Sequence, residues 1–111
     1  MVTDHDAFSY LASRYGITVV GAAIPSTSTA AEANARDTAR LIDLIEARGV
    51  CAVFSESSVD PKLIDQLAAE TGATVYPDLY CDTLGPAGSD AATYVEMMRH
   101  NARVLAEGFS C

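Results

Sequence analysis

Short apolar, β-branched runs alternate with stretches of helical periodicity along the whole chain, and this alternation constrains the fold most. Runs typical of strands cover residues 17–24, 50–54 and 74–76, and each is followed by a polar or glycine-containing segment and then by a helical pattern. Strands that alternate with helices form parallel sheets joined by right-handed crossovers. We therefore expect a single α/β domain over residues 1–111, with a parallel sheet of about three or four strands flanked by helices on both faces.

Residues that commonly begin helices precede the four helical patterns. The expected helices cover residues 4–15, about 30–48, 61–71 and roughly 90–107. Their expected N-terminal caps are Thr3 or Asp4, Thr29 with Glu32 in a capping box, Asp60 before Pro61, and Ser89. Because the chain enters a helix almost at once, the strand that should precede it is missing or reduced to residues 2–3. This is the pattern of a domain cut from something longer.

Composition and charge exclude several classes of function. The chain has 15 Asp and Glu against 7 Lys and Arg, a formal net charge of −8. Such a surface repels phosphate backbones, so nucleic acid is not an expected partner. No apolar run approaches the roughly 20 residues needed to span a bilayer, and the first residues lack the basic region and apolar core of a signal peptide. The protein is then cytosolic, or a segment carrying the signal lies outside this chain.

The three cysteines, Cys51, Cys81 and Cys111, show no CxxC spacing and are odd in number. They therefore predict neither a structural zinc site nor a disulfide framework, and three free thiols is the simplest interpretation. If one bridge forms, we expect it between Cys51 and Cys111. Both belong near one end of the expected sheet, whereas Cys81 belongs at the other end.

Candidate metal ligands fall where parallel strands end, which is where open sheets of this type bind ligands. His5 is expected in the first turn of a helix, whose dipole favours a neutral imidazole with a lone pair for a metal. Asp82 offers a hard oxygen at the same edge. Each alone is more simply a helix-start histidine or a turn aspartate. Together they form half of a metal site, because zinc takes about four protein ligands when its site is closed.

Other polar residues leave alternatives open. Glu56 either accepts a bond from His5 and orients its ring or bonds to loop amides beside Ser57 and Ser58. His100 is interpreted as a solvated or packing histidine and not as a ligand. The two methionines that precede it closely, at 97–98, are interpreted as core filler.

An enzyme is not expected, because the chain has no glycine-rich phosphate loop and no GxSxG elbow. The alternative to a metal-binding module is a small α/β hydrolase that uses Ser57, His5 and Asp82, which only their shared sheet edge supports. A ligand-free interaction domain is the remaining alternative.

Four segments of the chain form a joint pattern: HDAFSYL at 5–11, FSESSV at 54–59, LYCDTLG at 79–85 and YVEMMRHN at 94–101. In order and spacing, these segments resemble those of the metal-binding solute-binding proteins of ABC transporters, the zinc and manganese group called cluster A-I. Any one of these segments is a weak signal, but jointly they are specific and cover nearly the whole chain.

The resemblance implies more than the residues alone. Proteins of this family have two α/β lobes joined by a rigid helix, with one metal ion between them, and His5 and Asp82 match the two ligands of the C-terminal lobe. The N-terminal lobe, with its two histidines, and the linker helix have no counterpart here. The chain then resembles the C-terminal lobe of an extracytoplasmic receptor, periplasmic or lipid-anchored, that delivers zinc or, less favoured, manganese to a membrane permease. Cys81 stands where the family often has Ser and adds a soft donor.

Overall fold

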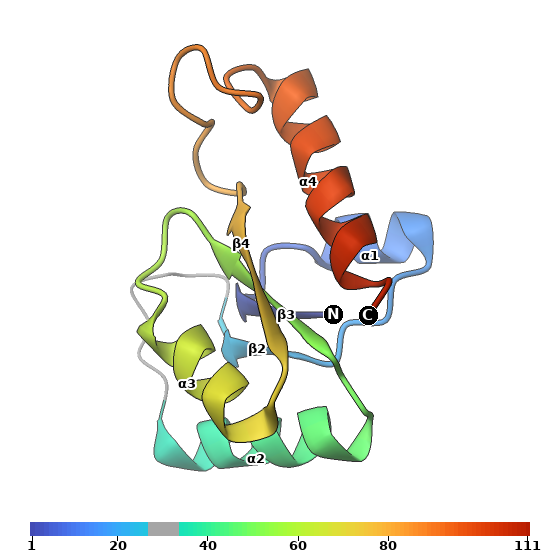
Figure 1. Ribbon diagram of the computed structural model, residues 1–111, viewed down its shortest axis with the longest axis vertical. Coiled ribbons are helices and arrows are strands. Elements are labelled where there is room, and N and C mark those ends of the chain that lie inside the picture. The colour runs from blue at the N-terminus through green and yellow to red at the C-terminus, as the bar shows by residue number, and fades with distance from the viewer. Residues whose placement is uncertain (27–33) are drawn as a thin grey trace.

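The sheet has four parallel strands, and the chain begins in its middle. The computed structural model describes residues 1–26 and 34–111. Its strands are β1 (Val2–His5), β2 (Gly21–Ile24), β3 (Ala52–Glu56) and β4 (Thr74–Leu79), in the order β2-β1-β3-β4 (Figure 1). Thr3 of β1 pairs with Ala22 on one side and with Phe54 on the other. The predicted parallel α/β architecture is confirmed.

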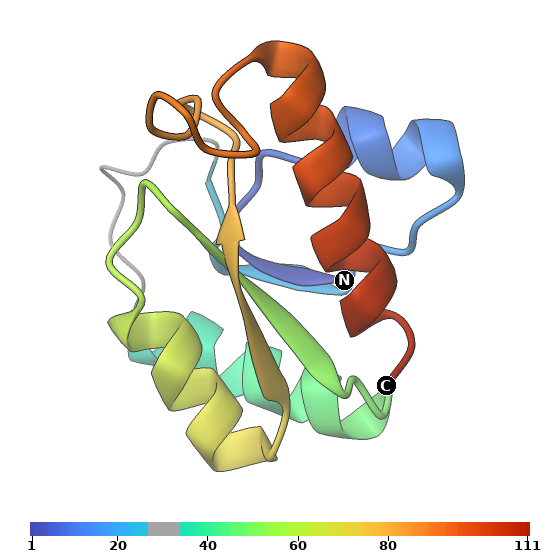
Figure 2. The same cartoon turned by 45° about the horizontal axis from the view of Figure 1, so that its top comes forward.

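In the described residues, four helices cover the two faces of the sheet. They are α1 (Ser9–Tyr15), α2 (Ala35–Ala47), α3 (Lys62–Thr71) and α4 (Tyr94–Gly108). Figures 1 and 2 show α2 and α3 together on one face and α1 and α4 on the other. The core is divided accordingly: Val53 packs with residues of α2 and α3, whereas its neighbour Phe54 packs with residues of α1 and α4. This division follows from the alternation of side chains along a strand.

Phe54 fixes how closely α4 approaches the sheet. Its side chain is fully buried, and its ring lies 5.7 Å from that of Tyr76 and 5.6 Å from that of Phe109. At Gly108, near the end of α4, an added Cβ would lie 2.5 Å from two atoms of the Phe54 ring. The missing side chain of Gly108 therefore allows the helix to rest directly on this ring.

A disulfide ties the C-terminal end of the chain to the sheet. Cys51, just before β3, is bonded to Cys111, with 6.0 Å between their Cα atoms. The predicted pair is thus confirmed, and the interpretation of three free thiols is wrong for these two residues. Cys81 is free and follows β4 at the opposite end of the sheet.

The first predicted helix begins too early. Residues 2–5 form the central strand β1, all four of them buried, and α1 begins only at Ser9. Thr3 and Asp4 therefore lie in a strand and cap no helix, and His5 ends a strand and does not lie in a first helical turn. Because these residues are polar, the sequence pattern does not indicate a strand here. The segment is a strand because it pairs with β2 on one side and with β3 on the other.

Two other helix starts differ from expectation. The expected capping box of Thr29 and Glu32 lies outside the described residues, and α2 begins at Ala35, where the Asn34 side chain accepts a hydrogen bond from a backbone amide of the first turn. The last helix begins at Tyr94 and not near residue 90.

Caps at the last two helices were partly predicted. Asp60 accepts a hydrogen bond from the Lys62 amide, but α3 begins at Lys62 with Pro61 at its N-cap position, one residue later than expected. At α4 the cap is Thr93, which forms a reciprocal capping box with Glu96, while the Ser89 hydroxyl accepts a hydrogen bond from the Ala91 amide in the preceding loop.

Among the described residues, no helix is long and apolar enough to cross a membrane.

Candidate metal centre

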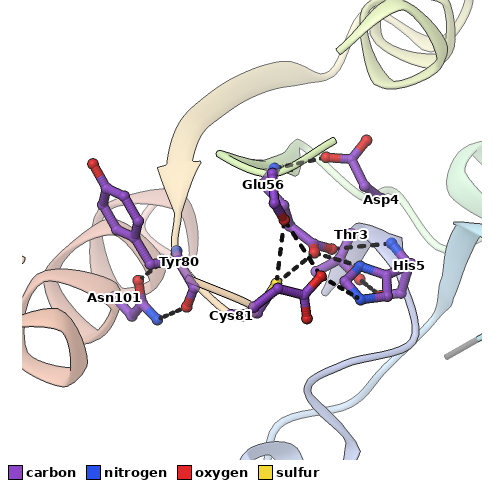
Figure 3. A network of polar contacts seen from close by, with 9 residues as sticks. Thr3, Asp4, His5, Glu56, Tyr80, Cys81 and Asn101 are labelled. Carbon is purple, nitrogen blue, oxygen red and sulfur yellow. Dashed lines mark hydrogen bonds and ion pairs between the residues drawn. The ribbon is translucent and has the colours of Figure 1, made fainter. Parts of the chain in front are cut away.

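Three adjacent strands end at one edge of the sheet and bring their polar residues together there (Figure 3). His5 is the last residue of β1, Glu56 is the last residue of β3, and Cys81 and Asp82 follow β4. One possible ligand atom each from His5, Glu56 and Cys81 lies within 4.8 Å of the others. Side chains that could bind a metal ion therefore meet at the edge predicted from the sequence.

Glu56 contacts His5 on the Nδ1 side of its ring and at its backbone amide. Both side chains are buried, and Glu56 Oε1 accepts a hydrogen bond of 3.0 Å from the His5 amide. Glu56 Oε2 lies 2.5 Å from Nδ1 of the His5 ring, although Nδ1 makes no hydrogen bond of acceptable geometry. In the described part of the chain Glu56 makes no bond to the amides of Ser57 or Ser58, so its contacts favour an orienting role over a loop-bonding role.

The other ring nitrogen of His5 faces Asp82. Nε2 lies 3.7 Å from Asp82 Oδ2, too far for a hydrogen bond. Two atoms bound to one zinc ion, each at roughly 2.0–2.2 Å, stand about 3–4 Å apart. The His5 side chain is 2% exposed and that of Asp82 is 47% exposed, so this pair lies at the boundary between core and solvent. The separation and position suit a shared cation.

Buried carboxylates make this edge negative. The Glu56 amide donates a hydrogen bond of 2.6 Å to Asp4 Oδ2, while Asp4 Oδ1 is buried without a hydrogen-bond partner. Burial raises the pKa of Asp4 to about 6, partly opposed by the hydrogen bond from Glu56. Together with Asp82, these acidic groups give the edge a field that attracts cations.

Cys81 completes the group on the β4 side. Its thiol donates a hydrogen bond of 2.9 Å to Glu56 Oε2, and its Sγ lies 4.0 Å from the Ser58 hydroxyl. Burial, the bond to Glu56 and the nearby charges of Glu56 and Asp82 raise the pKa of the Cys81 thiol far above its ordinary value.

The loop that carries Cys81 and Asp82 is held by α4. The buried Asn101 side chain accepts a hydrogen bond from the Tyr80 amide (3.0 Å) and donates one to the Tyr80 carbonyl (2.6 Å). From the sequence, Asn101 had no expected role beyond its place at the end of the segment YVEMMRHN. An amide side chain on the apolar face of a helix was the signal that could have shown this supporting role.

His100 has polar and aromatic contacts with residues other than the candidate ligands. Its ring nitrogens face Asp90 Oδ2 at 3.0 Å and the Asp78 carbonyl at 2.9 Å, and its ring packs edge-on against Tyr80. Of the two expected roles, solvated or packing, these contacts favour packing.

The residues of the alternative hydrolase are not assembled. Ser57 is exposed, and among the described residues its hydroxyl forms no hydrogen bond with His5 or Asp82. Ser58 is the serine that reaches Asp82, at 3.5 Å.

A parallel α/β domain with an imidazole, three carboxylates and a thiol at one sheet edge belongs to the class of domains that can bind metal ions. The chain belongs to the family described as "Zinc-uptake complex component A periplasmic", whose model matches residues 1–108.

The curated relatives are metal-binding substrate-binding proteins. The manganese-binding lipoprotein MntA of Bacillus subtilis is 39% identical over 110 residues, 95% of this chain and 35% of its own length. The zinc-binding protein TroA of Treponema pallidum is 38% identical over 106 residues, 91% of this chain and 34% of its own length. The chain therefore spans about a third of the length of these relatives. They are binding proteins and give no support to the hydrolase alternative.

Solved structures agree on the fold. The periplasmic zinc-binding protein TroA from Treponema pallidum superposes with a TM-score of 0.85 at 32% identity, over 97% of this chain and 40% of that one. A manganese-bound mutant of a periplasmic metal-binding protein from Candidatus Liberibacter asiaticus gives a TM-score of 0.87 at 25% identity, over 96% of this chain and 39% of that one. Relatives named for zinc and for manganese occur among both the sequences and the structures, so the relationship alone does not select the metal.

Proposed function

We propose that this chain is the C-terminal lobe of an extracytoplasmic solute-binding protein, which binds a divalent transition metal and delivers it to a membrane ABC permease. The observation that carries this proposal is the separation of 3.7 Å between His5 Nε2 and Asp82 Oδ2. The family match and the third of the relatives' length that the chain spans support the assignment to one lobe.

His5 and Asp82 are the two proposed ligands, and Glu56 is their support. A carboxylate on one side of a ligating imidazole fixes the ring and raises its basicity toward a metal on the other side. Glu56 lies on the Nδ1 side of His5, which leaves Nε2 directed at Asp82. Two further ligands come from the N-terminal lobe, outside these 111 residues.

Zinc is the favoured cargo and manganese the second candidate. An imidazole suits zinc, whereas a carboxylate serves either ion, and ligand type biases selectivity without fixing it. His5 thus favours zinc, while relatives include proteins named for each metal.

An extracytoplasmic location fits both the relatives and the disulfide. The relatives are named as lipoproteins or periplasmic proteins. Disulfides persist in oxidising compartments and are rare in the cytosol, so the Cys51–Cys111 bond supports the same location.

Calorimetry on the purified chain tests the proposal. A Cys81→Ser background removes the free thiol, so that only the cargo position is measured. We expect weak one-to-one binding of zinc that is lost in His5→Gln and in Asp82→Asn, because half a site supplies half of the ligands. Asp43→Asn, an exposed carboxylate on α2, is the matched control and should bind as the background does.

Two results contradict the proposal: a folded Cys81→Ser chain that binds neither zinc nor manganese, or tight binding by a monomer that His5→Gln leaves unchanged. The oligomeric state is measured alongside, because a dimer formed through the exposed metal edge could complete the site from two copies.

A further inference from the structure

We propose that this lobe contains a second, inner position for a thiophilic divalent cation such as zinc or cadmium, formed by His5 Nδ1, Glu56 and Cys81. This position lies on the opposite side of the His5 ring from the Nε2–Asp82 pair. It needs no ligand from another lobe, and it goes beyond the proposed function because it does not depend on Asp82.

The three donor groups are already close together. Cys81 Sγ lies 2.9 Å from Glu56 Oε2, which lies 2.5 Å from His5 Nδ1. Donor atoms on one zinc ion are separated by about 3–4 Å, since Zn–N and Zn–O bonds are roughly 2.0–2.2 Å and Zn–S bonds about 2.3 Å. Small outward shifts of these side chains make room for an ion between them.

The contact of the His5 ring with Glu56 is a further observation. His5 is 1% exposed, and its Nδ1 lies 2.5 Å from Glu56 Oε2 without a hydrogen bond of acceptable geometry (Figure 3). Buried polar atoms nearly always form well-aligned hydrogen bonds, so a close but poorly aligned contact calls for an explanation. A cation bound among His5, Glu56 and Cys81 gives Nδ1 a well-directed partner.

The charges of the occupied position balance. Zinc brings two positive charges, and the Glu56 carboxylate and the Cys81 thiolate bring one negative charge each. On binding, a metal–sulfur bond replaces the S–H···Oε2 hydrogen bond, and the thiol proton passes to solvent. A neutral group of ion and ligands is the form that a buried site tolerates.

The donor set determines the class of cation. Thiolate sulfur selects soft or borderline ions, whereas manganese prefers carboxylate and water oxygens. Three protein ligands leave one coordination position open, as in accessible zinc sites. Cys81 is only half-buried and lies beside the exposed Ser58, so an ion can reach the group from solvent.

The inner and outer positions exclude each other. A neutral imidazole has one lone pair, and whichever ring nitrogen binds a metal, the other carries the proton. The inner position therefore competes with the Nε2–Asp82 position for the same histidine.

Cobalt(II) absorption tests the inner position, because a cobalt–thiolate bond gives an ultraviolet charge-transfer band that oxygen and nitrogen ligands do not. Cys51 and Cys111 are bonded to each other, so Cys81 is the only free thiol in the chain and any such band belongs to it. We expect the band in the intact chain and in Asp82→Asn, and its loss in the near-isosteric Cys81→Ser. Zinc should displace it at equimolar concentration, whereas an excess of manganese should not.

Cobalt bound without the band, or a band that His5→Gln leaves unchanged in a folded protein, overturns the inner position. The outcomes also separate the two proposals. A band in Asp82→Asn together with no zinc binding by Cys81→Ser supports the inner position and contradicts the cargo site. Zinc binding by Cys81→Ser with no band in the intact chain supports the cargo site and contradicts the inner position.

Discussion

The Asn101 carboxamide binds both the amide and the carbonyl of Tyr80, so one buried residue of α4 fixes the backbone that leads into Cys81 and Asp82. The donor and the acceptor of this side chain are both used on the same peptide segment. The position of a proposed metal ligand therefore depends on how α4 packs on the sheet. Phe54 and Gly108 set that packing at the other end of the helix.

Removing the Asn101 side chain should loosen the ligand loop. In Asn101→Ala the Tyr80 amide and carbonyl lose their partners, and each unsatisfied buried group costs about 1–3 kcal/mol. Because Tyr80 is half-buried, we expect the free energy of unfolding in urea to fall by about 1–3 kcal/mol in total. Gln66→Ala, an exposed amide on α3, is the matched control, and equal losses in the two variants would contradict the role of Asn101.

The decline of stability in acid should depend partly on Asp90. The hydrogen bond from the His100 ring, with the charges of His100 and Arg103, holds the pKa of Asp90 below its ordinary value. The unfolded chain therefore binds this proton more readily, and the stabilisation present above the ordinary aspartate pKa of about 4 is lost as pH falls through the lower folded value.

Asp90→Asn removes that contribution, so its unfolding free energy should decline less steeply with falling pH than that of the parent protein. Urea unfolding between neutral pH and about pH 3 measures the two curves. The expected difference between the two curves of unfolding free energy is small because Asp90 is exposed. Asp43→Asn serves as the control and should run parallel to the parent, and a parallel curve for Asp90→Asn would count against this prediction.

Breaking the Cys51–Cys111 disulfide should destabilise the fold. The bond links residues 60 positions apart, and a cross-link of this kind contributes about 2–4 kcal/mol, mainly by restricting the unfolded chain. We expect a loss of that size in the double variant Cys51→Ala with Cys111→Ala. In Cys81→Ser, where the bond remains, adding reductant should lower the urea midpoint, and an unchanged midpoint would mean that the bond does not stabilise the fold.

Adding one methyl group at Gly108 should disturb the contact of α4 with Phe54. The new Cβ would lie 2.5 Å from the Phe54 ring, so the helix or the ring must move. Overpacking of this kind costs about 1–3 kcal/mol. Glu107→Ala, at an exposed neighbour, should change the unfolding free energy by no more than about 0.5 kcal/mol. A Gly108→Ala protein as stable as the parent would show that α4 can shift freely.

The parts of the fold that were predicted correctly depend on local patterns. The continuous apolar run in β3 and the periodicity of α3 are strong in themselves, and the order of such elements implies a parallel sheet. Strand β1 was not predicted because Thr3, Asp4 and His5 are polar. Their burial is possible only because β2 and β3 pair with them on both sides and Glu56 bonds to polar groups of Asp4 and His5.

By itself the sequence determined the fold class and the sheet edge at which His5, Glu56 and Asp82 would meet, because these follow from local periodicity and from parallel strands ending together. It also named Cys51 and Cys111 as the pair that a single bridge would join, but the structure decided that the bridge forms. Only the tertiary structure decided that Nε2 of His5 faces Asp82 while Nδ1 faces Glu56, to which the Cys81 thiol also bonds. Such distances join residues far apart in the chain, and they depend on strand register and on the packing of α4, which no local pattern specifies.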